Sequence, residues 1–236
     1  MITLSGALPQ VTSLFSEYDI FGAFQMTLVL AGATLVGSLL IGTVLAIMRV
    51  SPIASLQAGG AIYVNVVRNT PLTLIVVACS LGLYTQLGVV LADRDSGTFI
   101  VDNNVRLAVL GLSLYHASFV CEALRSGVNT VPLGQAEAAR SIGLTFRQSL
   151  SIVILPQAFR GAIAPLGNVV IALTKNTTVA ATIGVAEASY VMKEMIENRP
   201  DVLFGIFAIF ALGFILIVLP VGLVVTWASR RLAVTR

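Results

Sequence analysis

Residues 202–229 read VLFGIFAIFALGFILIVLPVGLVVTWAS and contain no charged side chain before Arg230. About 20 mostly apolar residues are enough for an α-helix to cross the hydrocarbon core of a bilayer. This stretch therefore predicts a membrane-spanning helix. It also sets the fold class, because a chain with several such stretches is an all-α membrane protein.

The composition of the whole chain agrees with that class. Hydrophobic residues make up 57% of the 236 residues and charged residues only 11%, and the mean hydropathy is +0.95. Soluble domains contain about 25% charged residues, so the composition excludes an ordinary soluble domain. A chain of this length has room for five or six spanning helices and little else.

Four more apolar stretches precede the quoted one, which gives about five transmembrane helices. The second stretch has a clear beginning, since Thr70 is a suitable cap and Pro71 suits the first helical position. We therefore expect spans at 20–48, 69–92, 105–125, 156–175 and 202–229. An odd number of spans puts the two termini on opposite sides of the membrane.

The distribution of basic residues predicts the direction of insertion, because cytoplasmic segments are enriched in Lys and Arg. With the N-terminus outside and the C-terminus in the cytoplasm, the inner segments hold eight arginines: Arg49, Arg125, Arg140, Arg147, Arg160, Arg230, Arg231 and Arg236. The outer segments then hold five basic residues: Arg94, Arg106, Lys175, Lys193 and Arg199. Arg68 falls at a boundary. This orientation is the better of the two.

The chain therefore divides into an extracytoplasmic segment, 1–19, a membrane domain, 20–229, and a cytoplasmic tail, 230–236. The first segment lacks a basic region and carries Glu17 and Asp19, so we do not expect a cleavable signal peptide. An outer connection at 176–201 contains a stretch with helical spacing, which we expect to be a surface or re-entrant helix.

The cytoplasmic loop at 126–156 differs from its apolar surroundings. Its sequence predicts two short helices, the first beginning at Pro132 and ending at Gly143. The second begins at a capping box formed by Thr145 and Gln148, and we expect it to end before Pro156. Helical spacing alone fits two interpretations: an amphipathic connector on the inner leaflet, or a docking element that another protein approaches closely.

The stretch EAARSIG, followed by VILP, resembles the EAA loop of permease subunits in binding-protein-dependent ABC importers. The pattern of that family is Glu-Ala-Ala, three residues, Gly, nine residues, Ile, one residue and Leu-Pro. It falls here on Glu137, Ala138, Ala139, Gly143, Leu155 and Pro156, with Val153 in place of the Ile. The resemblance implies the type I importer permease fold.

Further stretches narrow the resemblance to permeases for polar amino acids. VRNTPLTL at 67–74 is similar to an Arg-Gly-Thr-Pro-Leu segment of that group, with Asn69 in place of the usual Gly. GTFIVDNNVRLAVLG, GQAEAARSIGL, PLGN and LTKNTT look most like the glutamate importer permeases of actinobacteria. The likeness begins near residue 20 and implies an amino acid importer in a bacterial cell membrane, for glutamate or for glutamine or aspartate.

The resemblance also implies a set of partners. In the family, the EAA loop seats in a groove of a cytoplasmic ATPase, a role that would here fall to Glu137, Ala138, Ala139, Arg140, Gly143, Leu155 and Pro156. This chain has no P-loop, since neither of its two lysines follows a glycine. ATP and Mg²⁺ would therefore be held by the partner, and the chain would be a non-catalytic subunit. We expect a second permease, two ATPases, an extracytoplasmic amino-acid-binding protein and membrane lipid as partners, and no nucleic acid.

Ionisable residues near the apolar spans are candidates for a substrate path, because they are costly inside a bilayer. The candidates are Arg68, Asn69, Thr70, Glu122, Lys175, Asn176, Thr177 and Thr178. The cations would suit the carboxylates of glutamate and Glu122 its ammonium. Structural roles fit equally well: a snorkelling Arg68, capping by the polar residues, and an ion pair between Glu122 and Arg125.

Two other function classes fit less well. A secondary transporter often contains inverted repeats with broken helices, and no such symmetry is evident here. A membrane-embedded enzyme or metalloprotein needs a polar constellation within the spans. The single His116 and the separated Cys79 and Cys121 provide neither a metal site nor a nucleophile–base pair.

Overall fold

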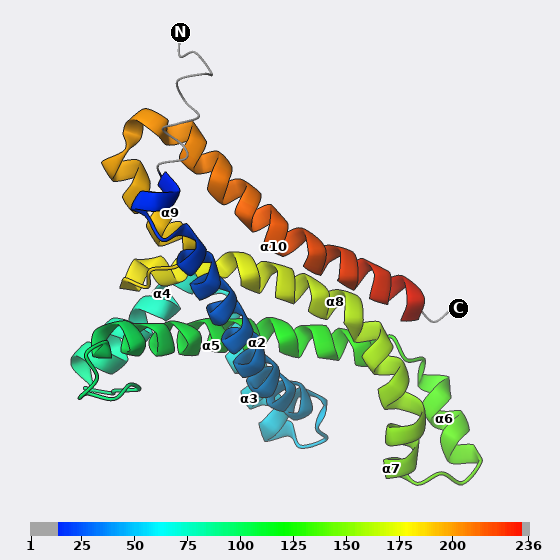
Figure 1. The fold of residues 1–236 in the computed structure, drawn as a ribbon. Helices are drawn as coiled ribbons and strands as arrows, with labels where there is room; N and C mark the ends of the chain where they lie inside the picture. The colour runs from blue at the N-terminus through cyan, green and yellow to red at the C-terminus, as the bar shows by residue number, and fades with distance from the viewer. Residues whose placement is uncertain (1–13, 233–236) are drawn as a thin grey trace. The chain divides into compact units, whose positions relative to one another are not determined.

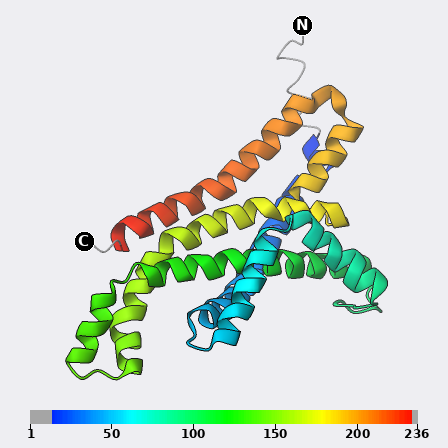
Figure 2. The same cartoon turned by 180° about the vertical axis from the view of Figure 1, so that it is seen from behind.

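The computed structural model describes residues 14–232, and that part of the chain is helical with short connections (Figures 1 and 2). The α-helices are α2 (Ile20–Val50), α3 (Ala54–Arg68), α4 (Leu72–Val77), α5 (Phe99–Asn129), α6 (Leu133–Ser141), α7 (Phe146–Gln148), α8 (Leu155–Asn176), α9 (Ala188–Asn198) and α10 (Leu203–Leu232). Wider π-helical turns form η1 (Ala78–Gln86) and η2 (Ser149–Ile154), and tighter 3₁₀ turns form η3 (Thr177–Ile183) and η4 (Pro200–Val202). The all-α class is confirmed.

Among the described residues, four helical stretches are long and apolar enough to cross a membrane: Ile20–Val50, Phe99–Asn129, Ser149–Ile183 and Pro200–Arg231. Ala54–Arg68 and Leu72–Gln86 meet the same criteria together, as one interrupted span bent by 104° at the break. Four or five spans agree with the number that hydropathy predicts.

The expected second span at 69–92 is wrong in its bounds. A separate helix over Ala54–Arg68 ends just before this range. Helical structure is interrupted after Arg68, resumes at Leu72 and ends at Gln86. Pro71 explains the break, since it lacks an N–H and disfavours helical geometry in the residue before it. The Thr70 hydroxyl donates to the Val66 carbonyl (2.9 Å), so it closes the preceding helix and does not cap the next one.

The helix that follows the capping box does not end before Pro156. Helical structure runs without a gap from Phe146 through η2 into α8. A proline inside an α-helix removes one hydrogen bond and crowds the carbonyl four residues earlier. The π-helical turn of η2 directly before Leu155 changes that hydrogen-bond pattern, which explains how the chain accommodates Pro156.

The described residues form two compact units. The first comprises residues up to Thr34, Pro71–Leu112 and Leu173–Leu219, and the second comprises Leu35–Thr70, Ser113–Ala172 and the residues from Pro220 onward. Each of the four long helices α2, α5, α8 and α10 contributes one part to each unit.

The first unit has an aromatic and aliphatic core. Phe24 of α2 stacks on Phe210 of α10 (ring centroids 5.5 Å apart) and meets Phe214 edge-on (5.6 Å). Met195 of α9 and Ile206 of α10 are fully buried in the same cluster. Such aromatic pairs add to the burial of area and fix the beginning of α2 against α10 within this unit.

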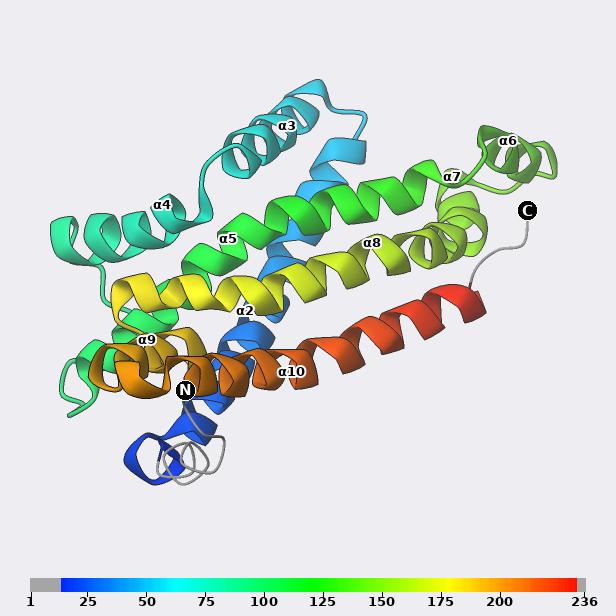
Figure 3. The same cartoon turned by 90° about the horizontal axis from the view of Figure 1, so that it is seen from above.

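In the second unit, small residues let helices approach closely. A Cβ atom placed on Gly42 of α2 would lie 2.8 Å from the Ala117 carbonyl oxygen of α5, too close to be accommodated. Gly127 of α5 lies equally tightly against Ala158 and Ala162 of α8, and the two helices run side by side there (Figures 1 and 3). Close packing through small residues is typical of helices in membranes.

Candidate functional site

The segment between α5 and α8 folds back on itself as a helical hairpin (Figure 1). Pro132 directly precedes α6 with extended backbone angles (φ −61°, ψ 138°), so the helix begins one residue later than predicted. At the other end, Gly143 has φ +84°, where a side chain would be strained. Its N–H donates to the Arg140 carbonyl (3.0 Å), and the Leu144 N–H donates to the Ala139 carbonyl (3.1 Å). This pair of bonds ends the helix sharply.

The EAA residues lie on an exposed helix. Ala139 is buried against the rest of the hairpin, whereas three motif residues are exposed: Glu137, Ala138 and Arg140. Two large apolar side chains flank them, with Leu133 84% and Ile142 78% exposed. Apolar side chains that surround small and charged residues on a surface of this kind suit contact with another protein.

The second arm of the hairpin begins with the predicted capping box. The Thr145 N–H donates to the Gln148 side-chain oxygen (2.9 Å), and the Gln148 N–H donates to the Thr145 hydroxyl (3.4 Å). Leu155 and Pro156 follow at the start of α8, and both are exposed. The hairpin therefore joins α8 through continuous helix, so a displacement of the hairpin would reach α8 directly.

Arg68, Asn69 and Thr70 lie at the break after α3. The Arg68 guanidinium lies over the Phe119 ring of α5, 5.2 Å from its centroid. The Asn69 amide donates to the Asn65 carbonyl (2.7 Å), as Thr70 does to Val66. These bonds satisfy carbonyls at the end of α3, and they agree with the structural interpretation of the two polar residues.

Glu122 lies between two arginines of the same unit. One carboxylate oxygen accepts a hydrogen bond from Arg49 of α2, and the other from Arg125, one turn along α5, at 3.3 Å. The predicted pair of Glu122 and Arg125 is thus confirmed, whereas Arg49 was missed because it lies 73 residues away in the sequence. A substrate ammonium would have to displace an arginine to reach Glu122.

Lys175 and Thr178 line a cavity of about 440 Å³ in the first unit. Its other lining residues are apolar and belong to α10: Phe214, Ile215, Val218 and Leu219. The neighbouring Thr177 is buried, and its hydroxyl donates to the Thr174 carbonyl (2.8 Å), which is a structural role. Asn176, the last residue of α8, is partly buried. Of the four candidates at 175–178, the structure therefore brings Lys175 and Thr178 together, and it places the Lys175 cation beside an apolar cavity.

Glu187 is a buried acidic residue that the sequence did not single out. It precedes α9, and its carboxylate accepts the Tyr190 N–H (3.0 Å), so it is the N-cap of that helix. Its other oxygen has no hydrogen-bond partner among the described residues. Burial raises its pKa to about 6, against the lowering effect of the Ser189 and Tyr190 amides. Glu is not a preferred cap, so the sequence carried only a weak signal.

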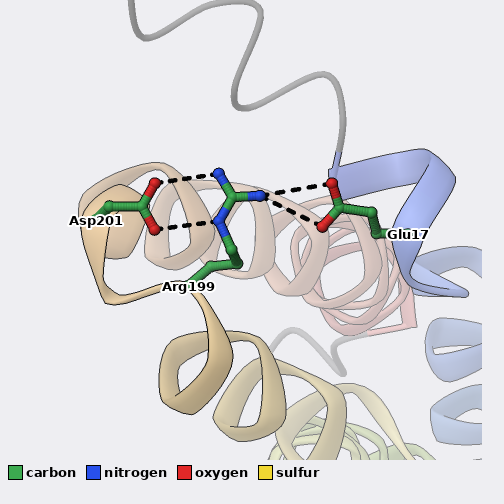
Figure 4. A network of polar contacts seen from close by, with 3 residues as sticks. All are labelled: Glu17, Arg199 and Asp201. Carbon is green, nitrogen blue, oxygen red and sulfur yellow. Dashed lines mark hydrogen bonds and ion pairs between the residues drawn. The ribbon is translucent and has the colours of Figure 1, made fainter.

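Arg199 forms a second ion network in the first unit (Figure 4). Its guanidinium lies between Asp201 (3.1 Å) and Glu17 (3.3 Å), and these bonds, chiefly the one to Asp201, raise its pKa. The network joins the residues just before α2 to the connection between α9 and α10. All three side chains are partly exposed, so this is a surface ion network.

The relatives of this chain are permeases. It is 56% identical over 214 residues to the "Glutamate transport system permease protein GluC" of Corynebacterium glutamicum, which covers 91% of this chain and 94% of that protein. It is 31% identical over 223 residues to the "Probable glutamine ABC transporter permease protein GlnM" of Bacillus subtilis, covering 94% and 97% of the two chains.

The fold has a solved counterpart. The structure described as "Crystal structure of an amino acid ABC transporter with histidines" matches with a TM-score of 0.81 and 26% identity, covering 98% of this chain and all of that one. The family described as "Binding-protein-dependent transport system inner membrane component" matches residues 38–234. The chain is a multi-pass bacterial membrane protein and belongs to this family of transport components.

Proposed function

We propose that this chain is the permease subunit of an ATP-driven glutamate importer, with its N-terminus outside and its C-terminus in the cytoplasm. It acts with a second permease subunit, two cytoplasmic ATPases that hold ATP and Mg²⁺, and an external binding protein. The observation that carries the proposal is the exposed hairpin of α6 and α7, which presents the EAA residues on its surface.

The hairpin gives a cytoplasmic ATPase a surface to bind on this chain. Its end at Gly143 is rigid because two backbone hydrogen bonds and a left-handed residue fix it. Leu133 and Ile142 offer apolar contact area, and Glu137 and Arg140 offer charges for specificity. Movement of the ATPases pushes on the hairpin, and continuous helix transmits the displacement to α8.

Substrate choice follows from the relatives and from charge. The relative that is 56% identical is described as a glutamate transport system permease protein. Glutamate carries two carboxylates and one ammonium. Lys175 is the cation beside the 440 Å³ cavity, and it attracts a carboxylate in surroundings that are otherwise apolar. Glutamine lacks the side-chain carboxylate and is the natural competitor for a comparison.

The coupling role is tested with Glu137→Lys in the complete importer, reconstituted in vesicles with its ATPase and binding protein. We expect a loss of ATPase association in detergent and at least a ten-fold loss of glutamate uptake, since an ATPase surface complementary to Glu137 would then face a like charge, which costs several kcal/mol. The matched control is Glu194→Lys, the same change at an exposed residue of α9. If Glu137→Lys left ATPase association and uptake intact, the docking role would be lost.

The substrate role is tested with Lys175→Gln in the same vesicles. A hydrogen bond to a charged group is worth about 1.5–3 kcal/mol, so glutamate uptake should fall about ten-fold or more while glutamine uptake changes little. Lys193→Gln, at the exposed lysine of α9, is the control. Equal losses of glutamate uptake and glutamine uptake would show that Lys175 does not bind the side-chain carboxylate of glutamate.

A further inference from the structure

A groove in the second unit combines apolar walls with a guanidinium. It has a volume of about 190 Å³ and is lined by the last turns of α2, the last turns of α5 and the first turns of α8. Its walls are mostly apolar side chains, among them Ile47, Leu124, Val128 and Phe159, and Arg125 lies among them.

The groove is open to the surroundings of the chain. Ile47 and Phe159 are more than 60% exposed, and Leu155 and Val50 about half exposed. Side chains of this kind at the surface of a membrane protein contact hydrocarbon. The groove therefore suits an acyl chain.

The charge at the groove is positive. Arg49 and Arg125 share the single carboxylate of Glu122, so the three residues together carry one excess positive charge. The Arg125 Nε atom is buried and has no hydrogen-bond partner among the described residues. A buried guanidinium nitrogen without a partner favours an anionic acceptor.

The two arginines lie close to the ends of their helices. Arg125 lies four residues before the end of α5, and Arg49 one residue before the end of α2. At a rise of about 1.5 Å per residue, Arg125 lies about 6 Å from the end of α5, and its bond to Glu122 turns its guanidinium toward the preceding turn of that helix. Both arginines thus belong to the last turns of helices whose ends the proposed orientation puts at the cytoplasmic surface.

We infer that this groove is a binding site for an anionic phospholipid, whose phosphate pairs with Arg125 and whose acyl chain covers the apolar walls. Basic pockets between transmembrane helices are known to hold anionic headgroups. In the orientation proposed above the lipid belongs to the cytoplasmic leaflet. The inference itself does not depend on the transported substrate.

The site is tested by fluorescence quenching in the full-length importer. Phe159→Trp places a fluorophore in the groove, and Trp227→Phe removes the chain's one natural Trp. The protein is reconstituted in phosphatidylcholine vesicles with increasing fractions of brominated phosphatidylglycerol or, separately, brominated phosphatidylcholine. We expect the anionic lipid to quench at a several-fold lower fraction than the neutral one.

Two variants separate the groove charge from general charge. Arg125→Gln should reduce the preference for the anionic lipid about five-fold, since one basic residue near the surface contributes about 1 kcal/mol, and Arg125→Lys should retain it. Arg160→Gln changes an exposed arginine of α8 that does not line the groove, and the preference should remain. If Arg125→Gln fails to fold, the inference is still tested by the protein that keeps Arg125, in which brominated phosphatidylglycerol must quench at a lower fraction than brominated phosphatidylcholine.

Other occupants give different results. Competition by millimolar inorganic phosphate would assign the site to a soluble anion and overturn the lipid. Weak quenching by both brominated lipids would mean that another protein surface, such as a second copy of the chain, fills the groove. Equal quenching by both lipids would show ordinary annular contact without a site. Each of these three results contradicts the inference.

Discussion

The two ion networks of the molecule have opposite compositions. In the first unit, one guanidinium, that of Arg199, lies between two carboxylates (Figure 4). In the second unit, one carboxylate, that of Glu122, lies between two guanidinium groups. The first network carries one excess negative charge, and its side chains are 25–50% exposed, whereas those of the second network are 16–37% exposed. Water screens the first network, so the second should matter more for stability.

The largest effect is expected from Glu122→Gln. The change leaves Arg49 and Arg125 facing each other without the carboxylate that both of them bind. Removing one partner from a buried network costs about 3–5 kcal/mol, and partial exposure reduces this to about 2 kcal/mol. The measurement is the unfolding midpoint in detergent, followed with a thiol-reactive dye that reaches the buried Cys79 and Cys121 only after unfolding.

Controls for this change come from the same unit. Glu137→Gln removes an exposed carboxylate and should leave the midpoint unchanged. The double variant Glu122→Gln with Arg125→Gln removes one charge of each sign, so it should recover part of the loss. If the loss in the double variant equals the sum of the losses in the single variants Glu122→Gln and Arg125→Gln, the charges do not interact and the explanation by pairing fails.

Glu187 extends the comparison to a buried carboxylate held by backbone amides. Its pKa is raised from 4.5 to about 6 because burial disfavours the charged form. The folded state therefore binds its proton more tightly than the unfolded state. The stabilising contribution is complete below pH 4.5 and is lost as the pH rises through 6, and its size is about 2 kcal/mol.

The Glu187→Gln variant tests this dependence. Gln can still accept the Tyr190 N–H but does not ionise, so the variant should be more stable than the unchanged chain at pH 7.5 by up to about 2 kcal/mol. The gain should disappear near pH 4.5. The measurement is the difference between the two unfolding midpoints from pH 4.5 to 7.5, with Glu194→Gln of α9 as the exposed control. A difference that does not change with pH would contradict the shifted pKa.

Local signals in the sequence predicted the hairpin of α6 and α7 correctly. Pro132 and Gly143 bound α6, and Thr145 with Gln148 forms the capping box. These features depend on residues within a few positions of one another, so a short window of sequence contains their cause. The spans followed from apolar composition for the same reason, except where the amphipathic helix α3 precedes Pro71.

Features that depend on tertiary packing could not be predicted from short windows of sequence. Glu122 was expected to pair with Arg125, but its second partner is 73 residues away. Glu187 owes its burial to packing against α2, where the Ala188 N–H donates to Thr27, 161 residues away in the sequence. No spacing rule connects positions so far apart. The continuation of helix through Pro156 was missed because it passes through the π-helical turn of η2, which no local pattern in the sequence marks.

The smallest effect is expected from Arg199→Gln, which removes the cation of the exposed network. Glu17 and Asp201 then lose their common partner but remain hydrated, so the unfolding midpoint should not change measurably at physiological ionic strength. At low salt the two carboxylates repel each other over a longer range, and a small decrease should appear that added salt abolishes. The comparison with Glu122→Gln is made in the same detergent at both salt concentrations. Equal losses for the two variants, insensitive to salt, would show that exposure does not distinguish the networks.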